Sequence, residues 1–263
     1  MDRCAQCGRQ IDQPSRGRRR RYCSRACQAR AYRDRKRTRP AVRVERPSAL
    51  TPARITAAAI ALADADGLRE LSMRRLATAL GVATMSLYRH FANRDALIQA
   101  MTDTVAGELR PSDSALGWRE RLSHEAREEW RLYRRHPWVL QVLASTRPPL
   151  GPNTLGNVER ALDAAASAGL PAEAAMTVYL ASSGIVQGIA LLPTSEQEVA
   201  DASGVSIEEW WEAQTSHLVE TLDPAAFPRL ARQPAGGAFT DFDAVFEFAL
   251  DALLTGVQSR LER

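Results

Sequence analysis

The sequence predicts an all-α protein, and three observations support this fold class. From residue 52 to residue 261, apolar residues recur three or four positions apart, which is the spacing of one helix face. Prolines, glycines and short polar residues stand where such helices would begin or end. No segment shows the alternation of apolar and polar residues that marks a strand of appreciable length. The 263 residues are enough for two or three small domains.

The composition is that of a folded globular protein, with 45% hydrophobic and 25% charged residues. It excludes a wholly disordered or collagen-like chain. No apolar run reaches the roughly 18 residues that a membrane span needs, because polar residues interrupt the best stretch, 178–192. The first ten residues contain no apolar region of a signal peptide. We therefore expect a cytoplasmic protein that does not contact a membrane.

Charge is distributed unevenly along the chain. Residues 1–46 contain 16 Lys and Arg against 4 Asp and Glu, whereas residues 111–263 contain 12 against 21. Nearly all of these cations are arginines, which suit bidentate contacts to phosphate and guanine, although a coding bias would produce the same composition. A basic head on an acidic body suggests a polyanionic partner for the head.

All four cysteines of the chain lie in the first segment, residues 1–37, with the spacing C-x2-C-x15-C-x3-C at Cys4, Cys7, Cys23 and Cys27. In a reducing compartment, such clustering favours a metal over disulfides, and four thiolates suit a tetrahedral Zn²⁺. Gly8 would give the tight turn of a zinc knuckle, and the last two cysteines lie one helical turn apart. The segment is similar to small zinc-ribbon or treble-clef modules, and we expect a structural zinc ion. The alternative is a reduced, disordered basic tail.

The loop between the cysteine pairs contains the basic run 16–21. We favour DNA as its partner because a short linker, residues 38–50, separates this segment from residues 51–110, whose helix-turn-helix pattern is described next. An RNA or protein partner, or a charge run that only faces solvent, remains an alternative.

Residues 51–110 predict a three-helix domain that contains a helix-turn-helix. Thr51 and Pro52 form a cap and first turn, and Gly67 ends that helix. Ser72 caps the next helix, and Asn93 caps the helix that follows the motif. A glycine followed by valine, at 81–82, separates two short helices, as in a helix-turn-helix. The second of these, 84–90, is then the recognition helix.

The stretch from Leu71 to Leu97 resembles the DNA-binding domain of the TetR family of regulators. The resemblance rests on the Gly-Val turn, the Leu-Tyr-x-His-Phe run and the Asn-Arg-Asp-Ala-Leu start of the next helix. It implies that three groups of residues contact DNA. They are an approach group of Ser72, Met73 and Arg74, a base-reading group of Thr84, Met85 and Ser86, and a phosphate-binding group of Tyr88, His90 and Arg94. The alternative is that such residues only pack the domain, and His90 could be a buried core histidine.

Residues 115–263 predict stacked amphipathic helices, with loops at 193–205 and 223–239 and a final helix from 242 to 261. Their order resembles the C-terminal domain of the tetracycline-repressor type, through a His-Pro-Trp element, a Gly-Pro-Asn element and two spaced glycines. The resemblance implies a homodimer through residues 171–192 and 241–261; a monomer is the alternative. An effector pocket is expected among the helices, with these candidate lining residues, each of which could equally be core: Trp118, Trp130, Trp138, Met176 and Tyr179.

These observations predict a ligand-responsive transcriptional regulator. We expect a repressor that binds a palindromic operator in double-stranded DNA as a homodimer and that a small-molecule effector releases. The alternative is an architectural or RNA-binding protein that uses the basic N-terminal segment. We do not expect an enzyme, because the sequence shows no nucleophile–base pair, no paired-carboxylate motif and no phosphate loop.

Overall fold

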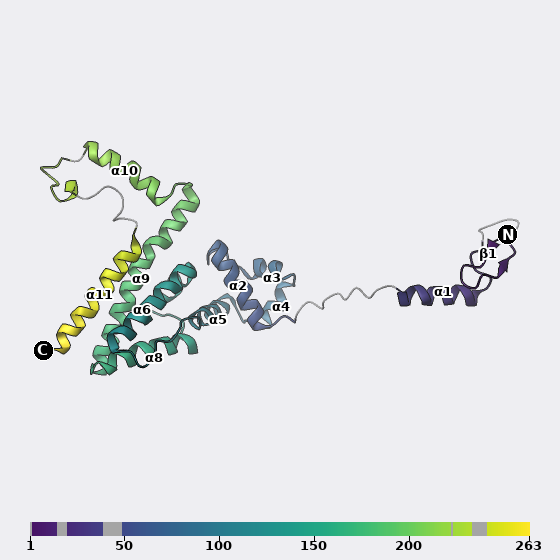
Figure 1. Ribbon diagram of the computed structural model, residues 1–263, viewed down its shortest axis with the longest axis horizontal. Helices are drawn as coiled ribbons and strands as arrows, with labels where there is room; N and C mark the ends of the chain where they lie inside the picture. The colour runs from purple at the N-terminus through teal and green to yellow at the C-terminus, as the bar shows by residue number, and fades with distance from the viewer. Residues whose placement is uncertain (1, 15–19, 39–48, 222, 233–240) are drawn as a thin grey trace. The chain divides into compact units, whose positions relative to one another are not determined.

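The computed structural model describes residues 2–14, 20–38, 49–221, 223–232 and 241–263 (Figure 1). The chain divides into two compact units, residues 1–49 and residues 50–263. In chain order the elements are β1 (Asp2–Arg3), β2 (Gln10–Ile11), α1 (Arg25–Thr38), α2 (Pro52–Asp66), α3 (Met73–Leu80), α4 (Thr84–Tyr88), α5 (Arg94–Ala106), α6 (Trp118–Arg135), α7 (Pro137–Leu143), α8 (Pro152–Ser167), α9 (Ala172–Ser203), α10 (Ile207–Thr221), the 3-10 turn η1 (Leu230–Arg232) and α11 (Phe242–Leu261). The predicted all-α class is therefore confirmed.

The N-terminal unit consists of a short antiparallel hairpin and helix α1. Strand β1 pairs with β2, so that Arg3 lies opposite Gln10. The small core of this unit contains Cys4, Ile11 and Ala31. The sequence did not predict the hairpin, because strands of two residues are too short to show an alternating pattern.

Helices α2 to α5 begin at the residues that the sequence indicated, but α4 ends at Tyr88, two residues before the predicted end of the recognition helix. Side-chain oxygens of Thr51, Ser72 and Asn93 each accept a hydrogen bond from the backbone N–H three residues further on. Gly67 ends α2, and Gly81 ends α3 in the left-handed conformation, with φ +66°. That conformation reverses the chain between α3 and α4 at little steric cost because glycine has no Cβ.

The apolar faces of these four helices meet in one core. Ile55 of α2, Leu76 of α3, Leu87 of α4 and Leu97 of α5 are fully buried there. The same cluster of buried side chains continues into α6, α7 and α9, so the helix-turn-helix packs against the helical body rather than standing apart from it.

The helical body is built around α6, which packs against α8 and α9 (Figure 1). Helix α8 also packs on α5, and α9 packs along α11. These contacts place α6, α8 and α9 around a common space, which is the cavity described below.

The predicted loop at 193–205 is wrong, because α9 continues to Ser203 and ends at Gly204 with φ +71°. Pro193 lies inside this helix, although proline removes one backbone donor and crowds the preceding turn. The sequence pattern predicted an end to the helix at that proline. The structure shows that a single missing hydrogen bond does not end a helix of 32 residues.

Candidate functional site

Helix α4 presents one face to the core and one face to solvent. Leu87 is fully buried, whereas 73% of Met85 and 43% of Tyr88 are exposed. Six residues of α3, α4 and the segment after α4 are at least partly exposed, and we call them the recognition surface: Arg74, Thr84, Met85, Ser86, Tyr88 and His90. His90 is exposed, so it is not the buried core histidine that the sequence allowed.

Three of the residues expected to contact DNA have other roles in the structure. Met73 is 7% exposed and belongs to the core, so we withdraw it from the expected contacts. The Ser72 hydroxyl accepts the cap hydrogen bond of α3. Arg94 donates from Nε to the carbonyl of Leu71 (2.9 Å) and from Nη2 to that of Leu68 (2.6 Å). Its guanidinium group therefore holds the turn that precedes α3.

A carboxylate of α5 caps the N-terminus of α8. Asp103 Oδ1 accepts hydrogen bonds from the backbone N–H groups of Asn153 (2.9 Å) and Thr154 (3.2 Å). The Asn153 side chain donates in return to the Asp103 carbonyl (2.9 Å). Gly151 leaves the space for this contact, because a Cβ there would overlap the Asp103 carboxylate. The last helix of the helix-turn-helix region is thus joined to the helical body.

A second set of polar contacts, which we also call a joint, connects α2 with α7. Asp64 Oδ1 accepts a hydrogen bond from Trp138 Nε1 (2.7 Å) and lies 2.7 Å from His136 Nδ1. The other ring nitrogen of His136 lies 3.4 Å from Glu108 Oε2. Both aromatic side chains are buried, whereas the Asp64 carboxylate that they contact is partly exposed.

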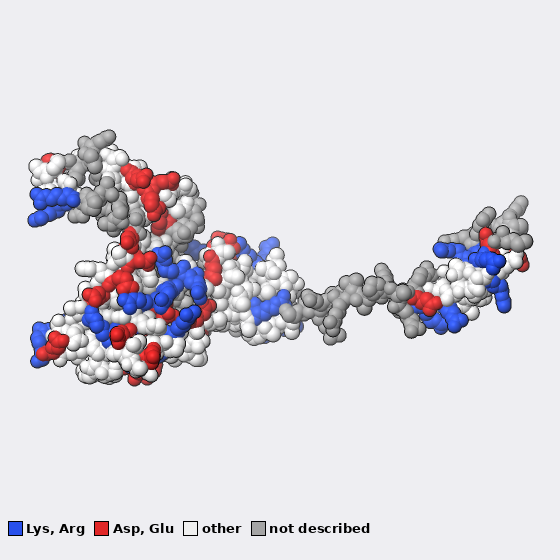
Figure 2. Space-filling view, in the orientation of Figure 1, with Lys and Arg blue, Asp and Glu red and all other residues white. Residues whose placement is uncertain are grey.

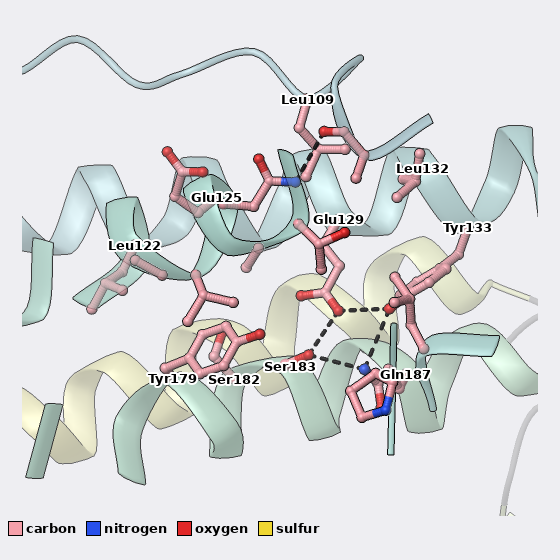
Figure 3. Close-up of a pocket in the computed structure, with 18 of the residues that line it drawn as sticks. Leu109, Leu122, Glu125, Glu129, Leu132, Tyr133, Tyr179, Ser182, Ser183 and Gln187 are labelled. Atoms are coloured by element: carbon pink, nitrogen blue, oxygen red, sulfur yellow. Dashed lines mark hydrogen bonds between the residues drawn. The ribbon is translucent and has the colours of Figure 1, made fainter. Parts of the chain in front are cut away.

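A cavity lies between α6, α8 and α9, with an empty volume of about 850 Å³ that includes some open solvent (Figure 3). Most of its wall is formed by aliphatic side chains, such as Leu122, Leu132 and Val158. Polar groups from α6 and α9 gather on one side. Among the described residues, the lining includes two carboxylates, Glu125 and Glu129, and no Arg, Lys or His.

One of the five predicted pocket residues, Tyr179, lines this cavity. The other four lie outside its lining: Trp118, Trp130, Trp138 and Met176. The Trp130 ring stacks on Phe246 of α11 at 4.9 Å, and the Trp138 indole binds Asp64, so these large rings join helices instead. Met176 lies on the exposed side of α9.

Glu129 is the centre of a polar cluster that was not predicted from the sequence. Its Oε1 accepts hydrogen bonds from the hydroxyl groups of Tyr133 (2.8 Å) and Ser183 (2.7 Å). The Gln187 amide donates to both of these hydroxyl oxygens, which closes the cluster (Figure 3). Burial raises the pKa of Glu129 above its ordinary value, and the hydrogen bonds offset only part of that effect. A carboxylate on the apolar stripe of α6, between Leu122 and Tyr133, was the signal available in the sequence.

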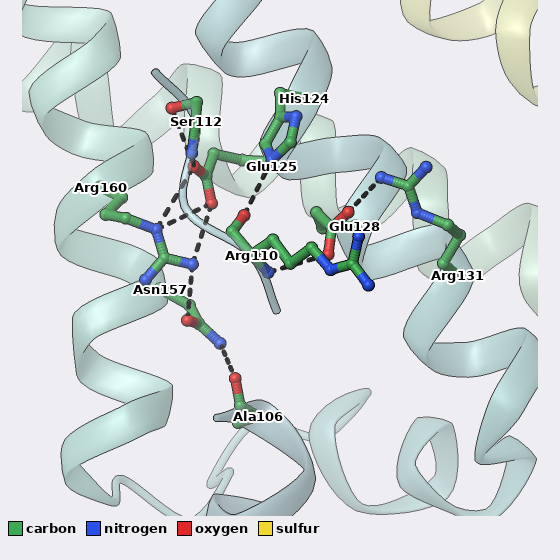
Figure 4. A network of polar contacts seen from close by, with 9 residues as sticks. All are labelled: Ala106, Arg110, Ser112, His124, Glu125, Glu128, Arg131, Asn157 and Arg160. Carbon is green, nitrogen blue, oxygen red and sulfur yellow. Dashed lines mark hydrogen bonds and ion pairs between the residues drawn. The ribbon is translucent and has the colours of Figure 1, made fainter. Parts of the chain in front are cut away.

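The neighbouring carboxylates of α6 have cationic partners (Figure 4). Glu125 accepts hydrogen bonds from Arg160 Nε (3.2 Å to Oε2) and from the Ser112 hydroxyl (3.2 Å). Glu128 pairs with Arg131 and accepts from the backbone N–H of Arg110 (2.9 Å). Their charges are thus compensated within the fold.

Helices α9 and α11 leave an apolar face exposed. Phe248 is 78% exposed and Leu180 is 60% exposed, and the other large apolar side chains exposed on these two helices include Leu191, Leu192 and Val245. A groove runs between the two helices, with Ala181 on one side and Gly256 on the other. Among the described residues, α9 contains one segment, Ala172–Glu196, that is long and apolar enough to cross a membrane. Its inner face packs instead on α6, α8 and α11.

The four cysteine thiols meet in the N-terminal unit, and none forms a disulfide. Their sulfur atoms all lie within 4.8 Å of one another. Cys23 Sγ lies 3.5 Å from the sulfurs of Cys7 and Cys27. A tetrahedral ion with bonds of about 2.3 Å to sulfur would hold its ligand atoms roughly 3.8 Å apart, so the cluster fits a metal ion.

The backbone around Cys4 also suits a thiolate ligand. Gly8, at φ +73°, turns the chain after Cys7, and its N–H donates to the Cys4 carbonyl (2.9 Å). Burial raises the pKa of the Cys4 thiol, but backbone N–H groups, including that of Cys23 (3.3 Å from Sγ), outweigh this and lower it to about 6. Described arginines of this unit, such as Arg9 and Arg21, are exposed around it (Figure 2). Residues 16–19 of the predicted basic run lie outside the described residues.

Comparisons with known proteins agree with this architecture. Residues 55–101 match the bacterial regulatory proteins of the tetR family, and residues 110–261 match the tetracyclin repressor-like C-terminal domain. The HTH-type transcriptional repressor DrrR1 of Streptomyces coeruleorubidus is 38% identical over 214 residues, which are 80% of this chain and 77% of that protein. An HTH-type transcriptional regulator of Saccharopolyspora erythraea is 35% identical, over 79% of this chain and 84% of its own.

Solved structures of TetR family proteins are also similar to this chain. ActR of Streptomyces coelicolor, without ligand, superposes with a TM-score of 0.67 at 31% identity, over 81% of this chain and 97% of its own. The same protein in complex with actinorhodin gives a TM-score of 0.68. A helix-turn-helix followed by a helical body with an internal cavity defines a ligand-responsive, DNA-binding transcriptional regulator. The chain belongs to the TetR family.

Proposed function

We propose that this protein represses transcription by binding a palindromic operator as a homodimer, and that a small molecule in the α6–α8–α9 cavity releases it. The exposed recognition surface on a rigidly packed α4 is the observation that supports DNA binding most directly. The start of such a helix enters the major groove. Thr84, Met85 and Ser86 would then contact base edges, while Arg74, Tyr88 and His90 would bind phosphates.

The test is selection of bound sequences from a random DNA pool with the full chain, followed by affinity measurements on the selected operator. We expect a palindrome, because two recognition helices reach successive major grooves about 34 Å apart. Arg74→Ala should weaken binding to all sequences and reduce the salt dependence, whereas Thr84→Ala should relax the preference at one position. Arg229→Ala, at an exposed arginine between α10 and α11, is the control.

Two outcomes would contradict this proposal. Unchanged operator affinity in both recognition-surface variants would show that α4 is not the helix that contacts the operator bases. Binding without any enriched sequence, and insensitive to these changes, would favour the architectural or RNA-binding alternative.

The cavity supports the effector part of the proposal. It lies against α8, which is joined to α5 through Asp103 and Asn153. A ligand that prefers one position of α8 would therefore prefer one position of the DNA-binding helices, which is what release requires. The similar protein ActR has been solved with actinorhodin and with (S)-DNPA, which indicates small molecules as ligands of this fold.

The exposed face of α9 and α11 supports the homodimer. Positions 248, 252 and 256 of α11 recur every four residues and so share one side of that helix, beside the groove that α9 borders. Large apolar side chains exposed beside an apolar groove are typical of an interaction site. A second copy of the same two helices would cover it in a four-helix arrangement.

We assign the four cysteines of the N-terminal unit to a structural zinc ion, and the basic residues around them to additional phosphate contacts. Cys4, Cys7, Cys23 and Cys27 provide four sulfur ligands at suitable separations. Elemental analysis of the purified full chain should find one zinc per protomer, and Cys7→Ser combined with Cys27→Ser should lose it. Retention of zinc in that double variant would contradict the assignment. Loss of zinc without any change in the salt dependence of DNA binding would show that the basic residues around the cysteines do not contact DNA phosphates.

A further inference from the structure

The two carboxylates of the cavity differ in their surroundings. Glu125 is paired with Arg160 through contacts of 3.2–3.3 Å, so its charge is balanced within the protein. The donors around Glu129 among the described residues are neutral: the hydroxyl groups of Tyr133 and Ser183, and the Gln187 amide beside them. Among the described residues, no basic side chain lines the cavity that could balance it.

The hydrogen bonds at Glu129 leave part of its carboxyl group available. Both hydroxyl donors bind Oε1. In Figure 3 the second carboxyl oxygen carries no dashed line and points toward the part of the cavity bordered by Tyr179 and Ser182. Hydroxyl donors on one oxygen favour the ionised carboxylate, yet the apolar wall around it disfavours an uncompensated charge. The Glu129 carboxylate therefore has one oxygen facing the cavity, where a positively charged group could bind it, and no such group among the described lining residues.

We propose that the effector is a largely apolar molecule with a protonated amine, and that its ammonium group binds Glu129 between α6 and α9. The proposal rests on the effector part of the proposed function and names the chemical class of the ligand. The aliphatic side chains of α6 and α8 would contact the apolar body of the molecule. An anionic ligand would face two carboxylates and no cation among the described lining residues, so the cavity should reject it.

The test compares three planar probes of similar shape on the full chain, by fluorescence titration at neutral pH. They are 9-(aminomethyl)acridine, whose amine is protonated to an ammonium group, acridine, which is neutral, and acridine-9-carboxylate, which is an anion. We expect the cation to bind about tenfold or more tightly than the neutral probe, as for a buried charge pair, and the anion to bind most weakly. Equal affinity for the cationic and neutral probes, or no binding of the cation, would overturn the proposal.

Variants separate the contribution of Glu129 from general attraction between charges. Glu129→Gln keeps the shape and an acceptor oxygen, and should remove the preference for the cationic probe over acridine. Glu159→Gln removes a carboxylate from the exposed side of α8, outside the cavity lining, and should preserve the preference. A preference that persists in Glu129→Gln would assign the cation to another site and overturn the proposal.

Failure of this inference is distinguishable from failure of the proposed function. Release of the selected operator by acridine or its carboxylate, with no preference for the cation, would leave an effector cavity in place and overturn the ammonium site alone. The wild-type comparison of probes does not depend on any variant folding. Melting curves of both variants, recorded with circular dichroism, check that each is folded.

Discussion

Glu129 occupies a position that the helix period assigns to an apolar residue. It follows Leu122 and Ala126 along the inward stripe of α6 and precedes Tyr133. A carboxyl group at such a position is costly in stability unless it is protonated or paired. The cluster with Tyr133 and Ser183 reduces that cost without removing it, which is consistent with a residue kept for ligand binding rather than for folding.

We expect Glu129→Gln to stabilise the protein, increasingly so as pH rises above the ordinary glutamate pKa of 4.5. Burial raises the pKa of Glu129 in the folded state above its ordinary value of 4.5, so the folded state binds more protons than the unfolded state in this range. The stability of the wild type therefore falls as pH rises through the interval between the two pKa values. Glutamine has no such dependence and still accepts from Tyr133 and Ser183.

Thermal unfolding at several pH values checks this expectation. Glu159→Gln serves as the control, because Glu159 is exposed and its removal should shift the melting temperature little at any pH. A Glu129→Gln variant that melts below the wild type across the whole range would contradict it.

Single residues were the hardest features to predict from sequence. Met73 lies within a motif whose neighbours face solvent, and only the packing of α3 shows that its side chain turns inward. Trp130 and Trp138 were sensible pocket candidates as large aromatic residues, yet their indole N–H groups bind Asp243 and Asp64 between helices. Which side of a helix faces a cavity depends on how the other helices pack against it. The pattern of apolar residues along the sequence therefore does not show which side chains line the cavity.

Helix boundaries, in contrast, were largely predictable. Thr51, Ser72 and Asn93 cap helices by local hydrogen bonds, and such bonds depend on a few adjacent residues. The same local reasoning failed at Pro193, where the rest of a long helix outweighs one unfavourable residue. It failed also at Gly151, whose importance lies in a contact with α5, about fifty residues earlier in the chain.

Gly151→Ala should weaken the joint between α5 and α8. The new methyl group would overlap the Asp103 carboxylate and lie 2.7 Å from Asp103 Cβ, so the carboxylate must leave the α8 N-terminus. Loss of this cap should reduce the free energy of unfolding by about 1–3 kcal/mol. It should also weaken the release of operator DNA by any effector, because the two helices would no longer move together.

Gly156→Ala is the matched control for this change. Gly156 lies within the same helix, and a Cβ added there would meet no atom within 4 Å, so alanine should be neutral or stabilise by up to about 1 kcal/mol. Chemical denaturation and operator-release titrations of both variants check the expectation. Equal behaviour of the two variants would show that the joint at Asp103 has no role in coupling.

The assembled molecule should be a dimer of 28.9 kDa chains. Phe248→Glu places a charge on the exposed face of α11 and should give monomers that bind the operator much more weakly. Leu155→Glu makes the same change at a half-exposed leucine of α8 and should leave the dimer intact. Sedimentation velocity of the three proteins distinguishes these states. A Phe248→Glu protein that remains dimeric would place the interface elsewhere.

The family was predictable because the helix-turn-helix motif is local and specific. The charge balance of the cavity was not, since Glu125 and Arg160 meet only when α6 packs on α8. The two-residue strands of the N-terminal unit were not predictable from the sequence either. They lie beside the cysteine cluster, and their residues show no alternating pattern of a strand.

The Asp103 cap links the cavity to the helix that follows α4. Asp103 lies nine residues from the start of α5 at Arg94, which is about 14 Å along the helix axis. The cavity-lining Ala161 lies eight residues beyond Asn153, about 12 Å along α8. Between them, the Asn157 amide donates to the Ala106 carbonyl (2.9 Å) and joins the same two helices a second time. An effector that displaces α8 would therefore act on α5 through both contacts, and α5 is the next helix after α4.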